Sequence, residues 1–236
     1  MSLPVISYPI HELNLPSTNQ TIKFRPFLVK EEKILLLAQS SENMKEIIDA
    51  VKTVISNCIL TEDVVIDDLT TFDLEYLFLK IRARSVNNIV SLTYRDLDDE
   101  KKYTVEVNLD EVEVIKDTTH TNKVEIDDNS GIIMKYPKAD LSNAMRVTEG
   151  ELDVFFDIVK NCIEKVYVGD KLYFAKDYSE EELEEFVTSL SVGTFNKIQE
   201  FFTTMPKLYH EIKYTNSLGT EKVIPLTNIN DFFSLG

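Results

Sequence analysis

The sequence contains little of several residue types whose abundance marks particular classes of protein. Its 236 residues include two cysteines, six glycines, seven prolines and no tryptophan. Two cysteines cannot form a disulfide framework, and we expect Cys58 and Cys162 to be buried free thiols because each lies in an apolar pattern of helical spacing. The low glycine and proline content, together with 43% hydrophobic residues, argues against a disordered chain and allows a sizeable core.

Basic charge is also scarce. The chain has 25 lysines and arginines against 41 aspartates and glutamates, which gives a net charge of −16. Nucleic-acid phosphates and anionic membrane surfaces repel such a chain, so we expect neither as a partner. The acidity serves solubility, or it steers the chain towards a basic protein. The sequence shows no apolar run of membrane-spanning length and no signal peptide, which predicts a protein of the cytoplasm in which it is made.

Catalytic motifs are missing as well. His11, His120 and His210 stand in no metal-binding or nucleophile motif, and the glycine-rich phosphate-binding patterns are absent. The acidic stretch at 96–100 lacks the glycine and terminal glutamate of an EF-hand, and the glutamates at 180–185 suit the first turns of a helix. We therefore expect a non-enzymatic protein with no cofactor and no bound metal.

Periodic patterns of hydrophobic residues run along most of the chain and predict an α+β fold. Thr148 and Glu151 predict a capping box at the start of one helix. Helices are predicted at 28–38, 41–58, 70–81, 148–163, 179–190 and 195–205. Strands are predicted at 21–27, 90–94, 103–107, 112–115, 123–126, 131–137, 171–175, 208–214 and 221–226. The strand pairs 90–107 and 208–226 predict two β-hairpins.

The two halves of the chain share an order of elements. In each half a helix ends in Asn-Cys-Ile, around Cys58 and Cys162, and a hairpin led by Tyr94 or Tyr214 follows. The spacing differs between the halves, so the alternatives are an internal duplication and a chance tripeptide. We expect an N-terminal helix-plus-hairpin half with short β segments at residues 1–137 and a C-terminal helix-plus-hairpin half at residues 138–236, which together can form one compact unit.

The segment FRPFLVKEEKILLLA at 24–38 is the most distinctive local feature. Aromatic residues and arginine are enriched at the centres of protein interfaces. Phe24, Arg25, Phe27 and Lys30 are therefore candidate partner-binding residues. The alternative is a strand-to-helix transition whose apolar face enters the core. A partner surface predicts that loss of the Arg25 side chain weakens binding with little effect on stability.

Several blocks of the sequence resemble the baseplate hub assembly proteins of T4-type bacteriophages. They are LPST at 15–18, FRPFLVKEEKILLLA at 24–38, FDLEYLFLKIRARS at 72–85, GIIMKYP at 131–137, AKDYSEEEL at 175–183 and FFTTMPKLYHEIKY at 201–214. The blocks follow the family's order along nearly the whole chain. Of these, FRPFLVKEEK is specific, whereas the SEEEL block alone would carry little information.

The resemblance implies a protein–protein interaction factor that helps build the central hub of a contractile tail baseplate, with other baseplate or hub proteins as partners. It implies an assembly chaperone in the host cytoplasm, and a permanent hub subunit in the virion tail is the alternative. Relatives often carry Cys-x-x-Cys pairs in hairpins that resemble zinc ribbons. Here the turns read RDLDDEKK at 95–102 and TNSLGTEK at 215–222, so we expect metal-free hairpins.

Overall fold

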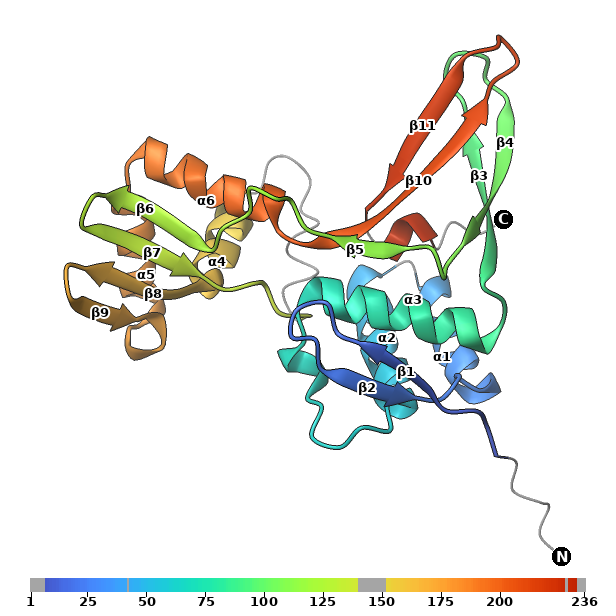
Figure 1. The fold of residues 1–236 in the computed structure, drawn as a ribbon, viewed down its shortest axis with the longest axis horizontal. Helices are drawn as coiled ribbons and strands as arrows, with labels where there is room; N and C mark the ends of the chain where they lie inside the picture. The colour runs from blue at the N-terminus through green and yellow to red at the C-terminus, as the bar shows by residue number, and fades with distance from the viewer. Residues whose placement is uncertain (1–6, 42, 140–151, 228, 233–236) are drawn as a thin grey trace, which may run out of the picture. The chain divides into compact units, whose positions relative to one another are not determined.

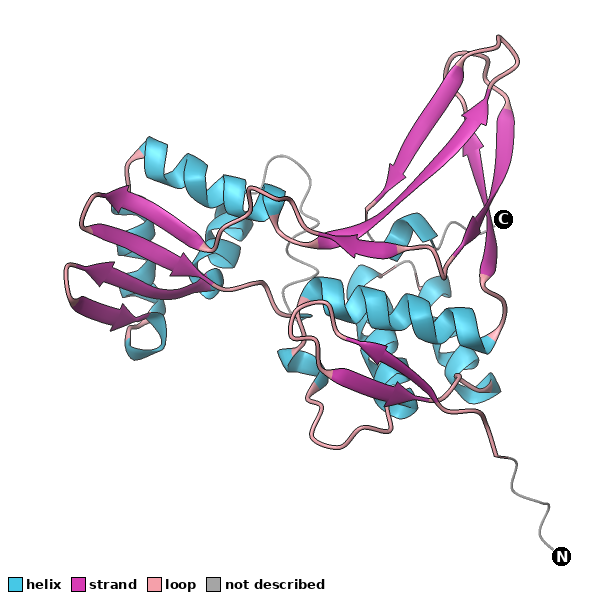
Figure 2. Cartoon of the chain, viewed as in Figure 1, coloured by secondary structure: helices cyan, strands magenta, loops and turns pink. Residues whose placement is uncertain are grey.

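The computed structural model describes residues 7–41, 43–139, 152–227 and 229–232, and it confirms the α+β class (Figure 2). Two compact units are present. The first comprises residues 1–66, 72–115 and 207–236, and the second comprises residues 67–71 and 116–206. The boundary expected between residues 137 and 138 therefore falls inside the second unit. The physical reason is strand pairing, since β10 pairs with β5 and joins the C-terminal hairpin to the first unit.

The first unit combines three helices with short antiparallel sheets (Figure 1). Its elements are β1 His11–Asn14, β2 Thr21–Phe24, α1 Val29–Ser40, α2 Met44–Cys58, α3 Thr71–Ser85, β3 Ile89–Arg95, β4 Lys102–Asn108, β5 Glu113–Ile115, β10 Lys207–Thr215 and β11 Glu221–Leu226. Strands β1 and β2 form one hairpin and β3 and β4 another, while β10 lies between β11 and β5. Leu79 of α3 packs with Leu92, Val107 and Ile212 in the core beneath the long hairpins.

The second unit is a four-stranded antiparallel sheet with helices on one face (Figure 1). Its elements are β6 Lys123–Asp127, β7 Ser130–Met134, α4 Leu152–Cys162, β8 Ile163–Val168, β9 Lys171–Phe174, α5 Glu180–Ser189 and α6 Val192–Thr204. The strands follow the order β6-β7-β8-β9. Val124 and Ile132 of the sheet pack against Val159 of α4, Val187 of α5 and Ile198 of α6. The alternation of apolar residues along the strands thus directs one face of the sheet to the helices.

The predicted strands and helices correspond to elements of the structure, with a few differences. Strand β8 was not predicted, because Ile163 continues the apolar stripe of the preceding helix in the sequence. Helix α2 begins after Asn43, whose side chain accepts from the Lys45 amide at 3.0 Å, rather than after Ser41. The capping box predicted at Thr148 and Glu151 lies outside the described residues.

The region around each cysteine has the same local geometry. Helix α2 ends at Cys58, whose carbonyl accepts from the Arg25 amide at 2.9 Å, and Ile59 forms a β-bridge with Phe24. Helix α4 ends at Cys162, whose carbonyl accepts from the Lys135 amide at 2.8 Å, and Ile163 pairs with Met134. In both cases the donor follows the second strand of a hairpin. The repeated geometry involves the β1–β2 and β6–β7 hairpins. The duplication expected from the sequence instead paired Cys162 with the Tyr214 hairpin, and these lie in different units, so duplication of those two halves stays a prediction.

Candidate partner-binding surface

The four predicted partner-binding residues have different environments. Phe24 and Phe27 are buried, with 2% and 8% of their surface exposed. The Arg25 side chain is 16% exposed, whereas that of Lys30 is 68% exposed. Only Lys30 is therefore placed to meet a partner in this conformation, and the binding role of the set stays a prediction.

Arg25 is held by a buried carboxylate. Its Nη2 lies 3.0 Å from Glu31 Oε1 and also donates to the Asn57 carbonyl at 2.9 Å. The Glu31 side chain is fully buried, and its Oε2 accepts from the Leu28 amide at 2.8 Å. Burial by itself raises the pKa of Glu31, but hydrogen bonds from Arg25 and Leu28 and the charges of Arg25 and Lys30 outweigh it and lower that pKa. The pair thereby fixes the start of α1 to the end of α2.

Helix α1 leaves three of its six apolar side chains exposed. Among its twelve residues only Glu31 is buried, while Val29, Leu36 and Leu37 are 81%, 58% and 61% exposed. A groove of about 210 Å³ lies beside the helix, between α1, α2 and α3. Its lining includes Leu35 and Leu36 of α1 together with apolar side chains from the other two helices. We call Val29, Leu36, Leu37 and this groove the α1 surface.

Sequence reasoning named the segment that contains α1 but not these side chains. The signal that could have found them is the run Ile34–Leu37, because four consecutive apolar residues cannot all face one side of a helix. Exposed apolar side chains beside a groove are typical of a protein-docking site. The arrangement can therefore bury apolar area against a partner.

The turns of the two long hairpins meet through polar side chains. Asp96 Oδ2 accepts from the Tyr214 hydroxyl at 2.9 Å and from Asn216 Nδ2 at 3.3 Å. Asp99 Oδ2 accepts from the Tyr103 hydroxyl at 2.5 Å and from the Ser217 amide at 3.0 Å. We call these residues the tip network. Burial raises the pKa of each aspartate, but the hydrogen bonds outweigh it and lower both pKa values.

Metal-binding geometry is not found in the described part of the chain, where no group of three or more His, Cys, Asp or Glu residues could hold an ion. The hairpin turns carry oxygen and amide groups in the tip network, without cysteine. Cys58 and Cys162 are both fully buried and unbonded to each other. Burial raises the pKa of Cys58 to about 11 and that of Cys162 to about 12, so both thiols stay protonated at neutral pH.

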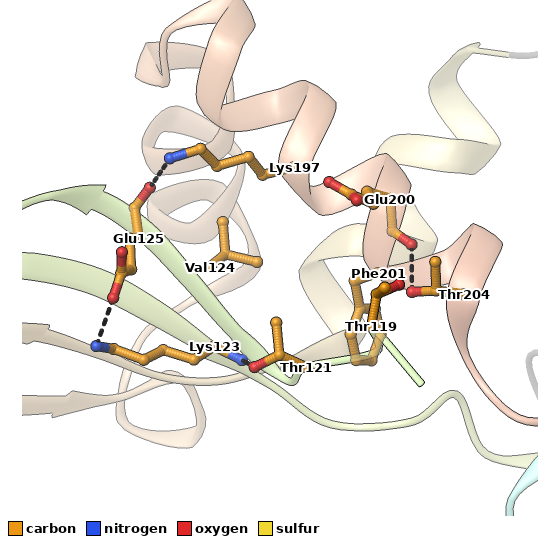
Figure 3. A pocket seen from close by; sticks show the side chains of 9 residues that line it. All are labelled: Thr119, Thr121, Lys123, Val124, Glu125, Lys197, Glu200, Phe201 and Thr204. Carbon is orange, nitrogen blue, oxygen red and sulfur yellow. Dashed lines mark hydrogen bonds and ion pairs between the residues drawn. The ribbon is translucent and has the colours of Figure 1, made fainter. Parts of the chain in front are cut away.

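A polar pocket of about 390 Å³ lies between β6 and α6 in the second unit (Figure 3). Three of its four charged residues are engaged locally, since Lys123 Nζ lies 2.7 Å from Glu125 Oε1 and Lys197 Nζ donates to the Glu125 carbonyl at 2.8 Å. Lys123 lowers the pKa of Glu125. A general acid or base at neutral pH needs the opposite shift in a carboxyl group. The arrangement resembles surface ion pairing more than acid–base machinery.

His120 lies near this pocket and is held by aromatic packing. Its ring stacks with Tyr136 at a centroid distance of 5.6 Å and contacts Phe201 at 5.2 Å. Its Nδ1 is 2.9 Å from the Thr204 hydroxyl, which donates to the Glu200 carbonyl at 2.7 Å. Burial lowers the pKa of His120, so the ring is neutral at pH 7. This environment suits a structural histidine.

These observations define an α+β protein whose best-formed candidate site is the exposed apolar α1 surface. The chain matches the family described as T4 bacteriophage base plate protein over residues 8–234, and it belongs to that family. No curated protein and no solved structure matches it. No helix among the described residues is long and apolar enough to cross a membrane. The sequence-based assignment to a T4-type baseplate family is thus confirmed.

Proposed function

We propose that this baseplate protein is a non-enzymatic interaction factor for assembly of the central hub, and that it acts as a chaperone for a hub protein. The α1 surface carries the proposal. Exposed leucines on a helix that buries a single residue gain no stability from folding of the chain alone, and they become favourable only when a partner covers them. The engaged charges around Glu125 support a role without catalysis.

A complementation experiment tests the role of the α1 surface. A phage that lacks this gene would be supplied with the wild-type protein or with the double variant Leu36→Glu, Leu37→Glu. The double variant should remain folded, because both side chains are exposed, but it should reduce infectious particles at least tenfold. Val192→Glu is the matched control, since Val192 is also exposed, at 78%, and lies on α6 of the other unit. Full complementation by the double variant would contradict the proposal.

Mass spectrometry of purified virions separates the chaperone from its alternative, a permanent hub subunit. A chaperone should be absent from virions or present far below the copy number of the hub proteins. A fixed stoichiometry in mature tails would favour the permanent subunit. The same preparations from cells that carry the α1 double variant would show which hub protein fails to enter the particle.

A further inference from the structure

Strand β9 forms an outer edge of the sheet in the second unit and exposes apolar side chains on both of its faces. Leu172, Tyr173 and Phe174 are 54%, 38% and 39% exposed. In the described part of the chain, β9 pairs with β8 on one side and no strand pairs with its other side (Figure 1). Its outer backbone groups can therefore form hydrogen bonds with an added strand.

An apolar groove of about 340 Å³ runs beside this edge. Tyr173 and Tyr178 line one part of it, and Leu183 and Phe186 of α5 line another. Glu182 is the one charged residue in the lining. Short edge strands with lysines commonly protect a sheet from aggregation, and β9 has Lys171. Such protection does not require an apolar groove next to the edge, so the groove needs a different explanation.

The rim of the groove on the α5 side is acidic. Helix α5 begins with Glu180, Glu181 and Glu182, and Glu184 and Glu185 follow. Glu182 accepts from the Ser179 amide at 2.8 Å, and Glu184 lies 3.3 Å from Lys160 Nζ. Glu181 and Glu184 lie towards Lys160 of α4, whereas Glu182 lines the groove and Glu185 follows it by about one helical turn. Glu182 and Glu185 are both exposed. Their charge attracts a basic segment and repels a second copy of this chain, whose net charge is −16.

We propose that β9 and the adjoining groove bind an extended segment of another baseplate protein, which adds a strand to the sheet. The segment carries apolar residues at alternate positions, with a lysine or arginine beside them. Its backbone pairs with β9, its apolar side chains enter the groove, and its basic side chain faces the α5 carboxylates. The inference rests on the proposed function, because it takes the partner to be a baseplate protein.

Site-specific cross-linking tests the identity of the occupant. The full chain, with a photo-reactive benzoylphenylalanine in place of Tyr178, would be produced during infection and irradiated while tails assemble. Cross-links should map to one segment of another phage protein with alternating apolar residues and a lysine or arginine. Cross-links only to a second copy of this chain, or none above the level of an unirradiated sample, would overturn the proposal.

A synthetic peptide of the cross-linked segment then provides the binding probe. Its fluorescence anisotropy with the purified full chain should give a Kd at least tenfold weaker for Tyr173→Glu than for wild type, with an unchanged melting temperature. Tyr178→Ser is the second variant if Tyr173→Glu does not fold. Val223→Glu, at a 53% exposed position on β11, should bind as wild type does. Equal affinity for wild type and the groove variants would overturn the proposal.

The charge requirement has its own measurement. The double variant Glu182→Gln, Glu185→Gln, which keeps the capping box at Ser179, should weaken peptide binding several-fold at low salt. The difference should shrink at roughly 0.5 M salt because exposed charges are screened. An unchanged Kd at low salt would contradict the acidic rim. Failure of this inference can be told apart from failure of the proposed function. If only the inference fails, the α1 double variant still blocks complementation, whereas Tyr173→Glu complements normally.

Discussion

A hydrogen bond joins the residue after a hairpin to the helix end at Cys58 and, in the other unit, to the helix end at Cys162. These two joins share backbone geometry but differ in the cation that follows the hairpin. Arg25 is largely enclosed and paired with the buried Glu31. Lys135, the equivalent residue, is exposed. The backbone amide makes the same hydrogen bond in both joins, at 2.9 Å and 2.8 Å, so that contact does not depend on the side chain. The comparison teaches that the cation is structural only where a buried carboxylate faces it.

The largest expected effect on the free energy of unfolding comes from one of two single variants, each of which removes the cation of one join. Arg25→Ala leaves Glu31 buried without its arginine and should lower the free energy of unfolding by about 3 kcal/mol, the low end for breaking a buried pair, since Arg25 keeps some exposure. Lys135→Ala should change it by less than about 0.5 kcal/mol. Urea denaturation followed by circular dichroism measures both. Similar losses in the two variants would show that the joins do not differ as described.

The long hairpins extend the comparison to their turns, where Asp96 and Asn216 occupy equivalent positions. Each follows a tyrosine by two residues and accepts a backbone amide two residues ahead, and the two side chains bond to each other at 3.3 Å. Asn216→Asp replaces the amide donor with a second carboxylate. Like charges at this distance should raise the pKa of the pair and open the tip network at neutral pH.

Hydrogen exchange at the Asp96, Leu218 and Thr220 amides measures this opening. At pH 7 the Asn216→Asp variant should lose roughly tenfold in protection, comparable to one charge-assisted hydrogen bond. The pH dependence should have opposite signs. In wild type the folded pKa values of Asp96 and Asp99 lie below the unfolded value of about 3.9, so tip stability is present above that pH and falls as the carboxylates are protonated. In the variant, acidification should first restore protection.

A smaller effect is expected at the residue with positive φ in each turn. Glu100 has φ of 56° and Gly219 has φ of 81°. Gly219→Ala should cost about 1 kcal/mol, because the left-handed region is unfavourable for a residue with a Cβ even though open space surrounds it. Glu100→Gly should be close to neutral, since relief of that strain offsets the greater entropy of the unfolded chain. Thermal unfolding measures both variants. Equal changes in melting temperature would contradict the view that a Cβ is unfavourable at these positive-φ positions.

The smallest expected effect is that of a chelator. The hairpins are joined by the tip network and by packing of Leu92 and Ile212, so EDTA should leave the melting temperature unchanged. Removing zinc from a metal-dependent ribbon unfolds it, because the binding energy is also folding energy. Elemental analysis provides the second readout. One tightly bound zinc per chain would require ligands outside the tip network.

The sequence determined the local structure and the family. Periodicity of apolar residues predicted most helices and strands, because an element that buries one face has apolar residues at a fixed spacing. The quoted blocks identified the baseplate family, which the match over residues 8–234 confirms. It failed at β8, where an apolar residue served both the end of a helix and the start of a strand. There the spacing alone cannot distinguish the two states.

Only the tertiary structure decided which residues of the segment at 24–38 are buried. Phe24, Arg25 and Phe27 are residue types typical of interfaces. In the fold Phe24 is buried, Arg25 bonds to α2 and Phe27 bonds to the end of α3, while Leu36 and Leu37 lie in solvent. It also decided that β5 pairs with β10, which moves the C-terminal hairpin into the first unit. The physical reason is the same in each case. Burial depends on contacts between segments far apart in the chain, and no local pattern encodes which segment will supply the partner.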